Sequence, residues 1–138
     1  MPNIGSIIIY ATANREVFQQ AISKIDSSLK NKLPIMIGVQ HPYFNTSNKT
    51  WYYRCGSSFN NPRYTNHFMV IVGKGKDSKG EFYYYYEVAT NDRSIGTSKE
   101  NKLWINKKNN LIQGNIFKQS YPYDNYYKIT QIRYINKK

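Results

Sequence analysis

The first regular hydrophobic pattern in the chain covers residues 15–31, REVFQQAISKIDSSLKN. Asn14 or Thr12 precedes the segment as a candidate N-cap, and Pro34 follows it as a helix stop. Its apolar residues recur at spacings of three and four, which is the period of a helix with one apolar side; they are Phe18, Ala21, Ile22, Ile25 and Leu29. The pattern predicts one amphipathic helix near the N-terminus.

After this segment the pattern changes to short apolar runs between polar loops, which is typical of β-strands. The loop KGKDSKG, residues 74–80, joins two of the runs. The expected strands are residues 35–39, 66–73 and 81–89, LWIN and LIQGNIF on either side of KKNN, and the C-terminal YYKITQIRYI. This order predicts an α+β domain, in which an N-terminal helix packs on a mostly antiparallel sheet of about six strands.

Residues 42–64 are rich in Asn, Ser, Thr and Pro and are interpreted as a long loop, in which WYY forms a short strand. Loops of this length in a small domain are usually functional or disordered. The aromatic residues in the segment argue against complete disorder. We find no internal repeat and no linker, so residues 1–138 are expected to form a single domain.

The composition restricts the partners and the chemistry. The chain has 20 Lys and Arg against 8 Asp and Glu, a net charge of +12, which favours anionic partners such as nucleic acid, anionic lipid or a wall polymer. A Lys- and Asn-rich genome would give the same balance. The single cysteine, Cys55, excludes an internal disulfide. The apolar run near the N-terminus is too short for a signal peptide or a membrane span.

One of the two histidines, His67, opens the expected strand 66–73, and Glu87 lies near the end of the next strand. If Gly73 faces Glu81 across the loop, His67 faces Glu87, because His67 lies six residues before Gly73 and Glu87 lies six residues after Glu81. Directly opposite side chains have Cβ atoms about 4.5–5.5 Å apart. A carboxylate that holds one imidazole nitrogen lets the other act as a general base. A purely structural cross-strand pair is the alternative.

Four segments in order, LPIMIGVQH, TNHFMVIVGKGKD, FYYYYEVAT and GTSKENKLWI, carry a family resemblance. The chain resembles the papain-like (NlpC-type, cysteine-peptidase-like) hydrolase domains of bacterial secreted effector and polymorphic-toxin proteins. The resemblance covers residues 25 to about 105 and, loosely, the last strand. It implies a papain-like domain that corresponds to the C-terminal two-thirds of the family pattern.

The resemblance also implies roles for individual residues. His67 matches the catalytic histidine of the family, and Glu87 matches the acidic residue that orients it. Asn91 and Asp92 are nearby alternatives for the orienting role. His41 matches a recurring histidine that is structural or lines the site.

The nucleophile of the family is a cysteine at a helix N-terminus, where the helix dipole and the histidine lower the pKa of the thiol. In this chain no cysteine precedes Cys55, which lies in the long loop that leads to His67. Three explanations stay open. The cysteine lies on a preceding segment or another chain; the domain binds without catalysis; or Cys55 is the nucleophile.

The resemblance implies a hydrolase that acts on peptide or amide bonds, with peptidoglycan stem peptides as the family-level substrate and an immunity or carrier protein as partner. Without a signal peptide, a specialised secretion system would deliver such an effector to a neighbouring cell. The alternatives are a catalytically inactive papain-like binding module and a basic nucleic-acid-binding domain, in which exposed tyrosines stack on bases. These tyrosines would be Tyr52, Tyr53, Tyr64 and Tyr83–Tyr86. We expect no cofactor and no metal site.

Overall fold

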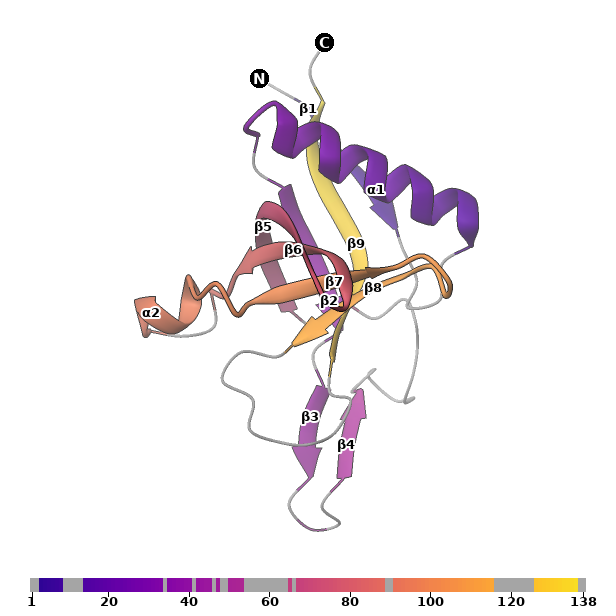
Figure 1. The fold of residues 1–138 in the computed structure, drawn as a ribbon. Helices are drawn as coiled ribbons and strands as arrows, with labels where there is room; N and C mark the ends of the chain where they lie inside the picture. The colour runs from indigo at the N-terminus through magenta and orange to yellow at the C-terminus, as the bar shows by residue number, and fades with distance from the viewer. Residues whose placement is uncertain are drawn as a thin grey trace.

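The structure is a computed structural model and describes residues 3–8, 14–33, 35–40, 42–45, 47, 50–53, 65, 67–88, 91–115 and 126–136. Figure 1 shows the arrangement of its elements. In chain order they are β1 (Asn3–Ile8), α1 (Arg15–Lys30), β2 (Ile35–Gln40), β3 (Pro42–Asn45), β4 (Thr50–Tyr53), β5 (His67–Asp77), β6 (Gly80–Tyr86), α2 (Arg93–Gly96), β7 (Lys102–Asn106), β8 (Leu111–Asn115) and β9 (Tyr126–Asn136).

The predicted amphipathic helix is present as α1, within one residue of its expected end. The side chain of Asn14 caps it by accepting a hydrogen bond of 2.8 Å from the backbone N–H of Val17. Phe18, Ala21 and Ile25 are buried in the same core as the strands. Figure 1 shows α1 crossing β1 and β9.

The main sheet has the strand order β1-β9-β2-β5-β6-β7-β8, and every pairing is antiparallel. An additional antiparallel pairing between β8 and β9 closes six of these strands into a barrel. Along its length β9 therefore pairs with β2 on one side, and with β8 and then β1 on the other. The inner side of the barrel is filled by large side chains, including Ile37, Met69, Tyr83, Tyr85, Leu103, Tyr127 and Ile132.

The predicted fold class is wrong. Instead of an α+β domain that starts with a helix packed on about six papain-like strands, the described residues form mainly antiparallel sheet, with two helices of 16 and 4 residues. A strand, β1, precedes α1, and β3 and β4 form a separate two-stranded sheet. The sequence did not reveal β1 because its hydrogen-bonding partner lies at the other end of the chain, where Asn3 pairs with Asn136.

The expected loop at residues 74–80 is also wrong. Strand β5 continues to Asp77, and only Ser78 and Lys79 turn the chain before β6. Gly80 does lie at the turn, with a φ of 118°, but Gly75 lies within the strand, opposite a large ring. A Cβ atom at Gly75 would lie 2.7 Å from the ring of Phe82. Glycine is thus used here to accommodate aromatic packing within a strand.

Part of the expected long loop at residues 42–64 is a hairpin. The predicted strand at WYY is confirmed as part of β4, and it pairs with β3, which the sequence analysis missed. The predicted hairpin around KKNN is confirmed as β7 and β8, with Asn106 facing Leu111.

Candidate active site

His67 and Glu87 come together at one end of the barrel. His67 is the first residue of β5, and Glu87 directly follows β6. The imidazole Nε2 lies 2.6 Å from the carboxylate Oε1. The His67 side chain is 15% exposed and the Glu87 side chain is 0% exposed. The predicted contact between the two residues is therefore confirmed, while their catalytic role stays a prediction.

The register that produces this contact differs from the predicted one. Near the turn, Gly73 faces Tyr84, and an uninterrupted ladder from that pair would place the imidazole and the carboxylate on opposite faces of the sheet. One extra residue in β5, Val72, shifts the pairing so that Ile71 faces Tyr85. This β-bulge brings both side chains to the inner face of the barrel.

Tyr127 of β9 completes a hydrogen-bonded chain with the pair. Its hydroxyl donates to Oε2 of Glu87 at 2.5 Å, and its ring stacks on the imidazole of His67 with centroids 5.7 Å apart. Burial, followed by the hydrogen bond to Glu87 and the charge of that carboxylate, raises the pKa of the Tyr127 phenol. Tyr127 therefore remains a hydrogen-bond donor, and each Glu87 oxygen has a named partner.

The α2 segment holds the backbone next to the site. The N–H of Glu87 donates to the carbonyl of Gly96 at 2.8 Å, and the N–H of Tyr85 donates to the carbonyl of Asn101 at 3.2 Å. The buried side-chain amide of Asn101 in turn donates to the carbonyl of Ile95 at 2.9 Å. These bonds fix the end of β6 and, with it, the position of the carboxylate.

The structure places the other predicted site residues differently. Asp92 caps α2, since its carboxylate accepts hydrogen bonds from the N–H and the hydroxyl of Ser94 at 2.9 and 2.6 Å. Asn91 is exposed beside it. Glu87, and not Asp92, is the carboxylate bonded to His67. Cys55 and His41 lie outside the described residues.

Tyr127 and Asn101 are the residues of this site that sequence analysis missed. The contact of Tyr127 with Glu87 depends on β9, which pairs with both β2 and β8 at the closure of the barrel. No spacing between the two residues along the chain indicates it. Asn101 lies in the polar stretch GTSKENK between two expected strands, and nothing in the sequence marks it as buried.

Two of the tyrosines proposed for base stacking are buried in the core. Tyr83 and Tyr85 have 0% exposure, so they cannot stack on nucleic-acid bases. Tyr86 is 44% exposed, and the side chains of Tyr52, Tyr53 and Tyr64 lie outside the described residues. Of the run Tyr83–Tyr86, only the partly exposed Tyr84 and the exposed Tyr86 are therefore accessible to bases.

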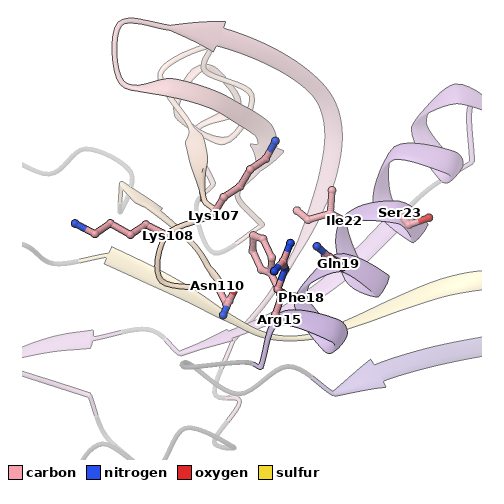
Figure 2. Close-up of a pocket in the computed structure, with 8 residues that line it drawn as sticks. All are labelled: Arg15, Phe18, Gln19, Ile22, Ser23, Lys107, Lys108 and Asn110. Carbon is pink, nitrogen blue, oxygen red and sulfur yellow. The ribbon is translucent and has the colours of Figure 1, made fainter.

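A hollow of about 550 Å³ lies between α1 and the turn that joins β7 to β8. Figure 2 shows Phe18 between the two elements, with Arg15 on the helix and Lys107 and Lys108 on the turn. None of its lining residues belongs to the His67–Glu87–Tyr127 chain. Its size suits a small ligand, and it is separate from the His67–Glu87 pair.

In the ranges that the structure describes, neither helix is long and apolar enough to cross a membrane. No three His, Cys, Asp or Glu residues in that part of the chain converge as metal ligands.

Comparisons with protein-family models, with curated proteins and with solved structures found no significant match. The resemblance to papain-like hydrolases therefore stays a prediction from sequence motifs, and the chemistry of the site has to be argued from its own geometry.

Proposed function

We propose that the protein is a cysteine hydrolase that cleaves peptide or amide bonds, with His67 as general acid and base, Glu87 as its orienting residue and Cys55 as nucleophile. The observation that carries the proposal is the 2.6 Å bond from His67 Nε2 to a fully buried carboxylate. A carboxylate held in this way is the arrangement by which acyl-transfer enzymes fix the tautomer of a catalytic histidine.

The proposed reaction follows from this tautomer. Because Nε2 is bonded to Glu87, proton exchange with the nucleophile falls to Nδ1 of His67. His67 takes the proton of the thiol, and the thiolate attacks the carbonyl carbon of the substrate. His67 then gives the proton to the leaving amine, which leaves a thioester. Water, deprotonated by His67, cleaves the thioester, so that a carboxylic acid leaves and the thiol is restored.

Glu87 has a defined electrostatic task in this scheme. Its charge stabilises the imidazolium that forms when His67 takes the proton, and the effect is larger away from water. Tyr127 holds the second oxygen and keeps the carboxylate in place. The chain charge of +12 favours an anionic substrate, and peptidoglycan stem peptides, with their free carboxylates, belong to that class.

Labelling of the thiol tests the proposal directly, because Cys55 is the single cysteine of the chain. We would measure the rate of alkylation by iodoacetamide against pH in the wild type and in His67→Ala. An imidazolium next to the thiolate lowers the pKa of the thiol. The wild-type rate should therefore inflect below pH 7, and the variant near the ordinary thiol value of about 8.5. The same inflection near that value in both proteins would refute the pairing.

Hydrolysis is then measured on purified peptidoglycan, with the products identified by mass. His67→Ala and Cys55→Ser should both lose the activity, while Asp92→Asn should keep it, because asparagine caps a helix as well as the aspartate that caps α2 here.

A binding module without catalysis is the second candidate. It is favoured by the complete burial of Glu87 and the low exposure of His67, which suit a polar cluster that rigidifies the end of the barrel. In that case the thiol titrates normally and the peptidoglycan stays intact.

A further inference from the structure

The hollow between α1 and the β7–β8 turn has an apolar floor. Its volume of about 550 Å³ is within the range of small-molecule sites. Phe18 is 4% exposed and belongs to the core, and Ile22, about one turn further along α1, is half-buried and packs against the same core. Figure 2 shows both side chains on the side of the helix that faces the turn. The floor can therefore cover the apolar part of a ligand.

The wall of the hollow is cationic. Arg15, Lys107 and Lys108 line it, and no Asp or Glu is among its described lining residues. Lys107 lies 3.6 Å from Glu81, but its side chain is 73% exposed, so water screens the pair. Within the described part of the chain, neither Arg15 nor Lys108 forms an ion pair with a carboxylate. Two positive charges beside the hollow therefore have no described acidic partner.

Neutral polar side chains complete the lining. They are Gln19 and Ser23 on α1 and Asn110 on the turn. Amide and hydroxyl groups donate hydrogen bonds to ligand oxygen atoms. The guanidinium of Arg15 suits two parallel hydrogen bonds to a phosphate or carboxylate, while a lysine is a point charge on a flexible stem. An apolar floor with a few polar groups around it is the usual composition of a small-molecule site.

We infer that this hollow binds a small amphipathic anion, namely an apolar ring that carries a phosphate group. The ring lies on Phe18 and Ile22, and the phosphate meets Arg15 and the lysines of the turn. A phosphate monoester carries about −1.5 to −2 charges at pH 7, which matches two unpaired cations better than a single carboxylate does. None of the lining residues belongs to the candidate active site, so this inference does not depend on the proposed hydrolase.

A nucleic-acid strand fits the surface less well. It would continue across the turn into a neighbouring hollow of about 450 Å³, which shares Lys107 and Lys108. There the indole N–H of Trp104 donates to the carboxylate of Asp77 at 3.0 Å, which places a negative charge beside the path of the phosphates. Phe18, at 4% exposure, presents no open ring face for base stacking. A small anion confined to the first hollow avoids Asp77 and needs no such face.

Isothermal titration calorimetry with 1-naphthyl phosphate, at pH 7 and about 0.15 M salt, tests the inference. The intact protein should bind one molecule per chain. The probe 1-naphthol has the ring without the charge, and inorganic phosphate has the charge without the ring. Each should bind about tenfold more weakly or worse, because the floor and the cations both contribute. Binding of either one as tight as that of 1-naphthyl phosphate overturns the inference.

Two variants of α1 form a matched pair. Gln19→Glu places a carboxylate at the hollow with almost no change in side-chain size, and repulsion should weaken binding of 1-naphthyl phosphate about tenfold or more. Gln20→Glu makes the same change at the next exposed residue, which does not line the hollow. Its affinity should stay within about twofold of the wild type, because salt screens the more distant charge. Equal weakening by both variants overturns the inference.

Removal of the cations is the complementary change. Arg15→Gln/Lys108→Gln should weaken binding, whereas Lys30→Gln/Lys99→Gln, which removes two exposed lysines outside the hollow, should not. Circular dichroism checks that each variant is folded. Absence of saturable binding up to about 1 mM 1-naphthyl phosphate overturns the inference. So does displacement of this probe by single-stranded DNA or anionic vesicles at an equal phosphate concentration, which would assign the hollow to a polymer or a membrane.

Discussion

The change Glu87→Ala gives the sharpest test of the buried chain at the end of the barrel. It removes the acceptor of two hydrogen bonds at once, one from His67 and one from Tyr127. The methyl group of alanine can replace neither, so the imidazole N–H and the phenol are left without this partner in a site where the carboxylate had 0% exposure.

The expected loss follows from the two bonds. Each hydrogen bond to a charged group contributes about 1.5–3 kcal/mol, so their sum is roughly 3–6 kcal/mol. Because small domains unfold with about 5–15 kcal/mol, Glu87→Ala should lose a large part of the total stability.

Urea unfolding, followed by circular dichroism, measures this loss as a change in the free energy of unfolding. Glu87→Gln is the matched control. Its amide oxygen accepts from His67 and its amide N–H can donate to the hydroxyl of Tyr127, so it should lose only about 1–2 kcal/mol. An unfolding free energy of Glu87→Ala within about 0.5 kcal/mol of the wild type would show that the chain does not stabilise the fold.

Three further predictions concern pH and packing. Burial raises the pKa of Tyr83, Tyr85 and Tyr127, so the folded state keeps three protons that the unfolded chain releases at high pH. The free energy of unfolding should then fall by roughly 4 kcal/mol per pH unit above pH 10, because these three phenols ionise only when the protein unfolds. Phenolate absorbance that completes its rise before the circular dichroism signal changes would contradict this. Gly114→Ala places a Cβ against the backbone of the neighbouring strand and should lower the free energy of unfolding in urea by about 1–3 kcal/mol. An unchanged free energy would mean that β7 and β8 can move apart at this position without loss of stability. Burial tends to raise the pKa of Asp77, but hydrogen bonds from an indole, a backbone N–H and a lysine outweigh this effect and lower the pKa. The ionised Asp77 carboxylate therefore stabilises the fold above about pH 4, and this stabilisation is lost as the pH falls further. Asp77→Asn should therefore flatten the acid side of a stability–pH curve, and an unchanged slope would count against that role.

The parts of the fold that depend on local pattern were predictable. The stripe of α1, its Asn14 cap and the hairpin around KKNN each follow from residues close together in the chain. The parts that failed depend on distant partners. Strand β1 is a short apolar run whose meaning comes from pairing with β9, and closure of the barrel leaves no mark on local periodicity.

The site shows how a prediction can be right for an incomplete reason. The spacing of His67 and Glu87 suggested a direct cross-strand pair around a seven-residue loop. The actual turn is shorter, and it would separate the two side chains if Val72 did not shift the register. A β-bulge of this kind has no reliable sequence signal, because valine is an ordinary strand residue. The catalytic role given to the pair is a matter for experiment.

The position of β9 has a consequence for folding. This strand hydrogen-bonds to β1, β2 and β8, so three strand edges remain unsatisfied until it is in place. A ribosome completes β9 after all the other strands, and pairing such as Asn3 with Asn136 closes a very long loop. The barrel should accordingly form late and slowly, only once β9 has been synthesised, as expected for folds with distant contacts. Until that moment the nascent chain exposes open edges to its neighbours, and its dependence on chaperones should end when β9 docks.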